Sequence, residues 1–581
     1  MAATDFPTPP ERDFFRLAEQ LMPGIGSVDR IVGYQSRTLD PGHRITLRLV
    51  DLLSRKLYES EFELRHVTPN AYWFLEDGVN AEQEDIERAA EEFEEVIYPA
   101  VTGTFGTEWN PGIDGDPHLY VVIANLRGAG GYFNAADEYP QEIRPISNEI
   151  EAIYINAGYL AVGKTPFSQV LAHELQHAVH WNADLSDETW VNEGLSELAV
   201  SIAGYPGYSI AAFRRAGPTS LTQWPANDIG GSENYGSASL FMHYLTEHYG
   251  GRDDLRPLLQ EPEDGIVGID AYLAAGGHGV TFTEVFRDWA VANLLDEDDG
   301  RYGYSDLSIR LPVYRNALVG EQLQSSIPQY SNEYVRLVAR EGDVRFIFQG
   351  DTTVPLLPVD APDGCWWSNR GDVIDSTLTT HVDLRNAEQA FLEYDVWFSI
   401  EEDWDFAYLQ LSEDDGATWS VLETPLSSTR DPLMVSFGPG YTGATEGWQR
   451  ESLPLDRWAG QEVLMRFQYI TDAAIHDHGL CVRNLRVIPA NRPSELETDW
   501  IPDGFVWSSN LVRQSYIVQV VYEGEEGSPN RVLQVELDES NRGEIILEQA
   551  DDVKRIVAII QPLAPSTRMP ANYTIKLERV R

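Results

Sequence analysis

Cysteine and lysine are both rare in this chain of 581 residues. Four of the 42 basic residues are lysine, which leaves 38 arginines, and the only cysteines are Cys365 and Cys481. Two cysteines cannot supply a zinc knuckle or a disulfide framework, although they can form one bridge. No apolar run approaches the roughly 18 residues of a membrane span, and no apolar signal-peptide core is visible at the N-terminus.

Positive charge is scarce as well. The 93 acidic and 42 basic residues give a net charge of −51, which opposes attraction to nucleic-acid phosphates and to anionic lipids. We therefore expect no nucleic-acid partner and no membrane span. Because ions screen the repulsion between like charges, such a surface suits a salty or extracellular medium, and we expect a secreted monomer.

Apolar residues are abundant enough for several packed cores. Hydrophobic residues make up 43% of the chain and aromatic residues 11%, which excludes a disordered or collagen-like protein. At about 150 residues per domain, the length predicts three or four domains. Helical periodicity dominates from 166 to about 296, whereas short runs of alternating apolar and polar residues, typical of strands, dominate from about 325 onward.

The segment LAHELQHAVHW contains the pattern H-E-x-x-H at His173, Glu174 and His177. Thr165 as N-cap and Pro166 in the first turn predict that a helix begins just upstream. Two histidines four residues apart lie on one helical face, so both can bind one zinc ion, and Glu174 can serve as general base. The alternative is a chance match, of which composition predicts about 0.02 in such a chain.

A catalytic zinc site of this kind requires a third protein ligand. The metzincin position for a third histidine holds Ala183, which excludes that class. The next segment, DETWVNEGLSELAVSIAGY, predicts a second helix with Asp187 as N-cap. Glu193 and Glu197 are four residues apart there, so both can face the first helix. A solvated helix face is the alternative interpretation of these two acids.

The segment WVNEGLSEL resembles the second signature of gluzincin metallopeptidases, and HELQH with WVNEGLSELA is similar to the hyicolysin-like members. The resemblance implies that Glu193 is the third zinc ligand and that Glu197 orients His173 through its other ring nitrogen. It also implies an oxyanion donor near the start of a later helix, where SENYGSASLFMHYL offers Tyr235, with His243 as a weaker substitute. An ordinary buried aromatic residue is the alternative for Tyr235.

The same resemblance extends to GGYFNAADEY, which is similar to the edge strand against which gluzincins align an extended substrate. Farther on, CWWSNRGDVIDSTLTTHVDL and WFSIEEDWDFAYLQLSEDDGATWSVL resemble the β-rich module of the immune inhibitor A peptidases. This second resemblance implies a secreted bacterial zinc endopeptidase with trailing jelly-roll modules. Acidic loops in such modules often hold calcium, which gives as candidate Ca²⁺ ligands Asp372, Asp375, Glu401, Glu402, Asp403 and Asp405. A solvated acidic loop is the alternative.

The two cysteines fall within this module. Cys365 opens the first predicted strand of the sandwich, and Cys481 lies in its apparent closing strand. Jelly rolls tend to bring their terminal strands together, so we expect a Cys365–Cys481 disulfide. Two buried free thiols are the alternative.

The expected fold is multidomain, with an α+β gluzincin (zincin) catalytic domain followed by all-β jelly-roll or β-sandwich modules. The expected parts are an N-terminal segment at 1–40, for which a role as pro-segment stays open, a zinc metallopeptidase domain at 41–325, the first strands of the β module at 326–360, a jelly-roll sandwich at 361–489 and a C-terminal β module at 490–581. We expect a Zn²⁺-dependent endopeptidase that hydrolyses proteins or peptides, since no G-x-M-E-N-like stretch is present to hold a free α-amino group. The alternative is a catalytically inactive cell-surface or glycan-binding adhesion protein.

Overall fold

The computed structural model describes residues 6–33, 38–207, 209–225, 231–298, 300–339, 342–490, 495–548 and 552–580. The chain forms two compact units, and each is discontinuous in sequence. The first unit contains Thr8–Gly207 and Gly364–Ser508. The second unit contains Met1–Pro7, Tyr208–Asp363 and Ser509–Arg581.

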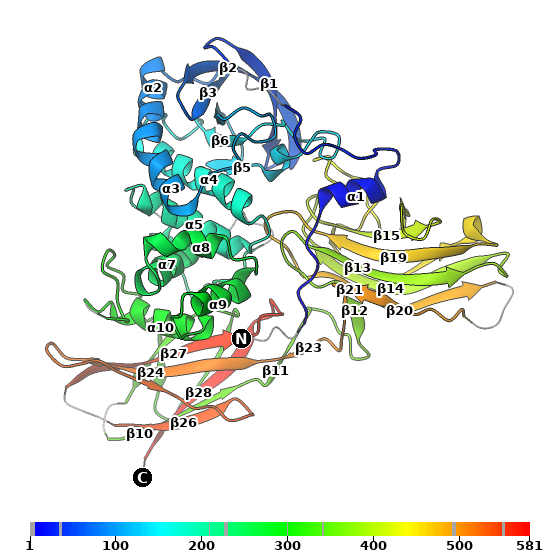
Figure 1. Ribbon diagram of the computed structural model, residues 1–581. Coiled ribbons are helices and arrows are strands. Elements are labelled where there is room, and N and C mark those ends of the chain that lie inside the picture. Colours follow the sequence, from blue (N-terminus) through cyan, green and yellow to red (C-terminus); the bar gives the residue numbers. More distant parts are fainter. Residues whose placement is uncertain are drawn as a thin grey trace. The chain divides into compact units, whose positions relative to one another are not determined.

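A mixed six-stranded sheet lies at the centre of the first half of the first unit (Figure 1). Its strands are β1 (Arg44–Asp51), β2 (Lys56–Val67), β3 (Ala71–Glu76), β4 (Leu119–Ala124), β5 (Gly131–Phe133) and β6 (Ala152–Asn156). The strand order is β1-β2-β3-β4-β6-β5, and the pairs β3–β4 and β4–β6 are parallel. The parallel strands are almost wholly buried, as their continuous apolar runs predict, whereas the short strand β5 lies at an edge.

The first unit also contains helices. They are α1 (Phe14–Leu21), α2 (Gln83–Glu92), the π-helix η1 (Phe93–Ile97), α3 (Tyr98–Phe105), the 3-10 helix η2 (Ala135–Glu138), α4 (Thr165–Ala183) and α5 (Thr189–Ile202). Helix α4 packs against β5, β6 and α5 (Figure 1). Phe167, Leu171, Leu175 and Val179 recur every four residues and form its buried apolar stripe.

The second half of the first unit is a two-layered β-sandwich. One sheet contains β12 (Cys365–Trp367), β14 (Ala390–Ile400), β17 (Gly443–Ala444), β18 (Gln449–Pro454), β20 (Gly479–Pro489) and β22 (Val506–Ser508). The other contains β13 (Asp375–Asp383), β15 (Phe406–Ser412), β16 (Ser420–Val421), β19 (Glu462–Ile470) and β21 (Ile501–Asp503), and the short helix η4 (Asp456–Trp458) precedes β19. Apolar side chains from both sheets form one core, and a disulfide joins Cys365 of β12 to Cys481 of β20.

The sandwich and the α/β half of this unit share a smaller apolar cluster. Phe14 and Leu17 of α1 pack there with Trp181 of α4 and with Phe406 and Tyr408 of β15. The expected N-terminal segment, 1–40, is therefore not separate from the rest of the chain. Its helix α1 packs into the core of this unit.

The second unit combines a group of helices with a second β-sandwich. Its helices are α6 (Ile210–Phe213), α7 (Ser232–His248), η3 (Arg252–Asp254), α8 (Leu255–Leu259), α9 (Gly265–Ala275) and α10 (Phe282–Leu295). Helix α10 begins with the expected capping box of Thr281 and Glu284. It packs against the sandwich, where the Gln561 side chain donates to the Phe286 carbonyl and the Tyr334 hydroxyl donates to the Ala290 carbonyl.

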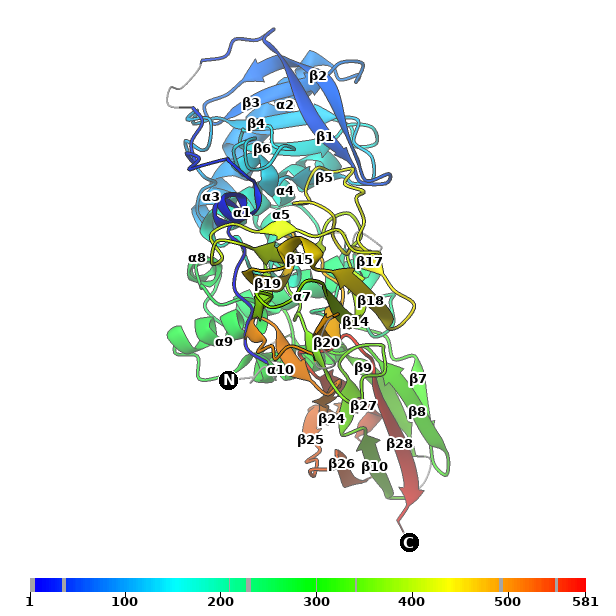
Figure 2. The ribbon, with the colours of Figure 1, turned by 90° about the vertical axis from the view of Figure 1, so that its right-hand side faces the viewer.

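Strands from two distant parts of the chain build this second sandwich (Figure 2). They are β7 (Arg315–Leu318), β8 (Gln322–Ile327), β9 (Glu333–Val338), β10 (Val344–Gly350), β24 (Ser515–Gly524), β25 (Arg531–Gln534), β26 (Arg542–Leu547), β27 (Val553–Leu563) and β28 (Ala571–Arg579), with β11 (Thr353–Pro355) and β23 (Leu511–Arg513) as a separate pair. The sheet orders are β26-β10-β28-β8 and β25-β24-β27-β9-β7. The strands expected within 326–360 and those expected within 490–581 are therefore mostly parts of one sandwich, and the strands of the first sandwich continue to Ser508.

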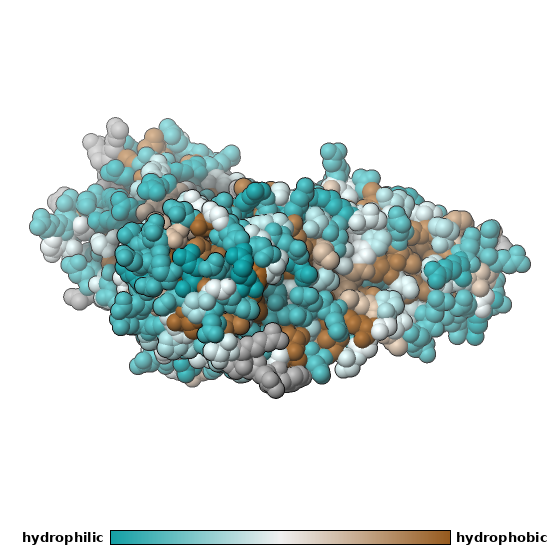
Figure 3. Space-filling model, turned by 90° about the horizontal axis from the view of Figure 1, so that it is seen from above, coloured by the Kyte–Doolittle hydropathy of each residue, from teal (hydrophilic) through white to brown (hydrophobic). Residues whose placement is uncertain are grey.

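The chain is thus multidomain, with a mixed α/β N-terminal region and an all-β C-terminal region, as the sequence predicts. Within the described residues, no helix is both long and apolar enough to cross a membrane. The face shown in Figure 3 is mostly hydrophilic, in keeping with a net charge of −51.

Candidate metal centre

Helices α4 and α5 carry the residues of the H-E-x-x-H segment and of the second signature. Helix α4 begins at Thr165, with Lys164 rather than Thr165 as its N-cap and Pro166 in its first turn. Helix α5 begins at Thr189, with Glu188 rather than Asp187 as its N-cap. Each helix therefore starts within one or two residues of the predicted position.

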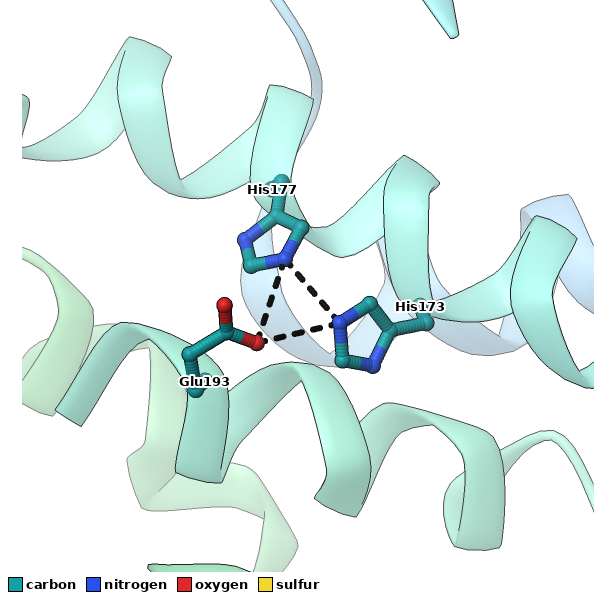
Figure 4. Close-up of side chains that lie close together, drawn as sticks. All are labelled: His173, His177 and Glu193. Carbon is teal, nitrogen blue, oxygen red and sulfur yellow. Dashed lines mark hydrogen bonds and ion pairs between the residues drawn. The ribbon is translucent and has the colours of Figure 1, made fainter. Parts of the chain in front are cut away.

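The side chains of His173, His177 and Glu193 converge between the two helices (Figure 4). The His173 and His177 Nε2 atoms are 3.0 Å apart. Glu193 Oε2 lies 3.1 Å from His173 Nε2 and 3.5 Å from His177 Nε2. The structure thus brings together the three ligands that the sequence predicts.

These distances fit a zinc ion. With zinc–ligand distances of about 2.0–2.1 Å, tetrahedral geometry places neighbouring ligand atoms about 3.3 Å apart. The three observed separations, from 3.0 to 3.5 Å, span that value. Two imidazoles and one carboxylate are also a donor set of catalytic zinc sites, which keep a further position open for water or substrate.

Residues on one face of α5 contact the Nδ1 atoms of both histidines, which are the ring nitrogens that point away from the cluster. Glu197 Oε1 lies 3.5 Å from His173 Nδ1, as the resemblance implies. Asn192 Oδ1 lies 2.7 Å and Ser196 Oγ 3.1 Å from His177 Nδ1. Neither contact to His177 was predicted from the sequence, although positions 192, 193, 196 and 197 share a face by helical spacing.

Electrostatics favour an ionised Glu193. Burial alone would raise its pKa, but attraction to His177 and hydrogen bonding with both histidines lower the pKa well below its ordinary value. Burial alone would lower the pKa of His173, but hydrogen bonds with Glu193 and Glu197 and the negative charges of Glu193 and Glu174 raise it well above its ordinary value. A carboxylate must be deprotonated to bind a metal, so Glu193 is poised as a ligand.

Glu174 lies next to the cluster of His173, His177 and Glu193 but is not part of it. Its side chain is 5% exposed, and burial, assisted by repulsion from Glu193, raises its pKa despite the opposing attraction of both histidines. The Phe133 backbone N–H of strand β5 donates to the Glu174 carboxylate. Gly131 of the same strand passes so close that a Cβ atom there would lie 2.8 Å from Glu174 Oε1. A raised pKa suits a general base, and the expected edge strand runs directly beside it.

The remaining histidine of α4, His180, belongs to a different group. It is fully buried, with Nε2 3.5 Å from Asp187 Oδ2 and Nδ1 3.5 Å from the Gln176 side chain. These contacts explain His180 as a structural histidine.

Tyr235, the expected oxyanion donor, lies in the second unit, in the first turn of α7. Its ring packs edge-on against Trp224, with ring centroids 4.8 Å apart. His243, the weaker substitute, lies farther along the same helix. A catalytic role for Tyr235 stays a prediction.

A second group of potential metal ligands lies in the sandwich of the first unit. Oxygen atoms of Glu401, Asp405 and Asp472 all lie within 4.8 Å of one another. Burial and repulsion from the other acids raise the pKa of Glu401 and Asp405 well above their ordinary values, and burial raises the pKa of Asp472 to about 7. Of the expected calcium ligands, Glu401 and Asp405 belong to this group.

The other expected calcium ligands have different partners. Asp375 pairs with Arg16 at 2.8 Å, Glu402 with Arg55 at 2.7 Å and Asp403 with Arg430 at 2.9 Å. Asp372 accepts hydrogen bonds from Thr189 and His476. The structure therefore does not gather the expected set, because successive side chains in this loop-and-strand region point in different directions.

Comparison with known proteins supports relationship to metalloproteases over part of the chain. The family described as "Immune inhibitor A-like, MAM domain" matches residues 339–491. A protein named "Pre-pro-metalloprotease PrtV" from Vibrio cholerae serotype O1 is 30% identical over 214 residues, which is 37% of this chain and 21% of that protein. "Immune inhibitor A" from Bacillus thuringiensis subsp. alesti is 25% identical over 188 residues, 31% of this chain and 26% of that protein. The matches thus span about a fifth to a quarter of the length of these relatives.

Proposed function

We propose that this chain is a zinc-dependent endopeptidase of the gluzincin class, with a zinc motif like that of hyicolysin-like enzymes. The observation that carries the proposal is the convergence of His173, His177 and Glu193 at 3.0–3.5 Å, with Glu174 buried beside them. Similarity to a protein named as a metalloprotease supports the same function.

The proposed chemistry divides among these residues. His173, His177 and Glu193 would hold the zinc ion, which when bound supplies the Lewis acidity that activates water and polarises a peptide carbonyl. The Glu174 carboxylate accepts the proton of the attacking water and then delivers it to the nitrogen of the leaving amine. Glu197, Asn192 and Ser196 keep both imidazoles oriented through their Nδ1 atoms. Tyr235 is proposed to stabilise the oxyanion of the transition state.

The proposed substrate is an extended segment of a protein. Strand β5 is an edge strand adjacent to Glu174, so its outer edge can pair with a peptide in β conformation. Main-chain pairing of this kind does not depend on a free terminus, which favours cleavage within a chain over removal of terminal residues. A secreted, monomeric enzyme is proposed from the acidic surface and the buried Cys365–Cys481 disulfide.

Calcium is proposed as a second ion, bound by Glu401, Asp405 and Asp472 in the sandwich. Three carboxylates in one place suit a hard cation, and the buried Glu401 Oε2 has no hydrogen-bond partner among the described residues. We expect added calcium to raise the melting temperature of the wild type and not of Asp405→Asn. Equal calcium-dependent stabilisation of both proteins would exclude this site.

The experiment that tests the proposed function measures zinc and proteolysis on the same purified sample. We expect about one zinc per chain, hydrolysis of casein, loss of hydrolysis with a chelator and its return with added zinc. A folded chain that neither contains nor takes up zinc would refute the proposal. That outcome, together with glycan or cell-surface binding, would instead favour the adhesion protein.

A further inference from the structure

The start of helix α5 is held by the sandwich rather than by its own neighbours in sequence. Glu188, the N-cap residue, makes no side-chain capping hydrogen bond. Instead, Asp372 Oδ2, from the loop between β12 and β13, accepts hydrogen bonds from the Thr189 backbone N–H at 2.9 Å and from the Thr189 hydroxyl at 2.7 Å. A residue 183 positions away thus satisfies a backbone group that the first turn of a helix leaves unpaired.

The surroundings of Asp372 fix its position and favour its ionised form. Its side chain is 1% exposed, and His476 Nδ1 lies 2.8 Å from its other oxygen, Oδ1. Burial alone would raise the pKa of Asp372, but attraction and hydrogen bonding from His476, together with the bonds from Thr189, lower it. A buried carboxylate at the positive end of a helix dipole is favourable for the helix.

A second loop of the sandwich contacts the same residue of α5. The Ile475 backbone N–H donates to the Thr189 hydroxyl at 3.0 Å, so this hydroxyl joins both loops. Val373 and Ile475, which flank Asp372 and His476, have φ angles of 56° and 62°. The left-handed region is rarely adopted by β-branched residues, and such strain persists only where the surrounding structure fixes it. Both loops are therefore held in an unfavourable conformation where they meet α5.

This contact lies one helical turn from the metal centre. Thr189 and Glu193 are four residues apart on α5, and the same helix carries Asn192, Ser196 and Glu197, which contact the two histidines. A shift at the start of a rigid helix moves all these groups together relative to His173 on α4.

We propose that Asp372 is a positioning residue of the metal centre, through which the sandwich fixes helix α5 and hence the ligand Glu193. The inference rests on the proposed zinc site. The sandwich would then help to set the geometry of the metal centre.

The test compares Asp372→Asn with Glu451→Gln in the full-length protein. Glu451 is a matched control because it is a buried acid of the same sandwich, where it accepts hydrogen bonds from Tyr394, Tyr441 and the Leu426 backbone N–H, all within the sandwich. We expect Asp372→Asn to weaken zinc binding, measured by chelator competition, about tenfold or more. We also expect kcat on casein to fall more than KM changes, whereas Glu451→Gln keeps zinc affinity within about twofold of the wild type.

Thr189→Val provides a second variant that keeps the backbone bond to Asp372 and removes the hydroxyl that joins the two loops. We expect a smaller loss of zinc affinity in the same direction. If the wild type binds zinc and cleaves casein, and both variants bind zinc as tightly as Glu451→Gln, this inference alone is overturned. A wild type without zinc would refute the proposed function and this inference with it.

Discussion

Removal of the Cys365–Cys481 disulfide should destabilise the sandwich of the first unit. Both cysteines are fully buried, and the bridge joins β12 to β20. Strand β12 contains only three residues and pairs with β20 at Trp366–Val482 and Trp367–Cys481. Strand β12 also pairs with the equally short β22, so both of its ladders contribute few hydrogen bonds, and the disulfide adds a covalent link to β20.

The magnitude follows from the length of the closed loop. A separation of 116 residues corresponds to a loss of unfolded-state entropy of about 16 cal/mol/K, or about 4.8 kcal/mol at 25 °C. Native disulfides realise roughly 2–5 kcal/mol of such stabilisation. We expect the double variant Cys365→Ala with Cys481→Ala to lose stability within that range.

Hydrogen exchange followed by mass spectrometry is the suitable assay because it reports the free energy of opening strand by strand. Amides of β12, β14 and β20 should exchange faster in the double variant by an amount equivalent to roughly 2–5 kcal/mol. Amides of β24 and β27, in the other sandwich, serve as the internal control. Unchanged exchange in β12 and β20 would refute the reasoning, and alkylatable thiols at both cysteines of protein recovered from its native medium would contradict the bridge.

Three further predictions concern single side chains. Burial raises the pKa of Asp137 to about 7, against about 3.9 in the unfolded chain. The contribution of Asp137 to the free energy of unfolding is therefore full below about pH 4 and is lost as the pH rises to 7. We expect this loss, roughly 4 kcal/mol when measured by urea unfolding, to be absent in Asp137→Asn. An equal pH slope in both proteins would contradict this. Glu197→Gln should weaken zinc binding about tenfold in chelator competition because it loosens His173, and wild-type affinity would argue against that contact. Thr281→Ala should lower the free energy of opening of α10 by about 1 kcal/mol in hydrogen exchange, and an unchanged value would show that the capping box is dispensable.

The convergence of the candidate metal ligands was partly predictable from sequence because each helix sets its own spacing of side chains. Helical spacing alone places His173 and His177 on one face of α4, and the same rule places Glu193 and Glu197 on one face of α5. The packing of α4 against α5 then brings the two faces together. What the spacing could not show is the role of Asn192 and Ser196, since polar residues on a helix face have many uses.

Features that depend on strand pairing were not predictable in the same way. The register of β15 with β19 pairs Phe406 with Ile470, which brings Asp405 close to Asp472, 67 positions away. The calcium ligands expected from the sequence lie near Asp405 along the chain, so Asp472 was not among them. The contact of Asp372 with α5 was missed for the same reason, because it depends on tertiary packing across 183 positions.

In the proposed mechanism, Glu174 transfers the proton while His173, His177 and Glu193 bind zinc. The most direct test measures zinc content and casein hydrolysis of Glu174→Gln and the wild type side by side. We predict about one zinc per chain in both proteins and a loss of turnover of at least about 10²-fold in the variant. A Glu174→Gln protein that retains its zinc and most of its turnover would contradict the account.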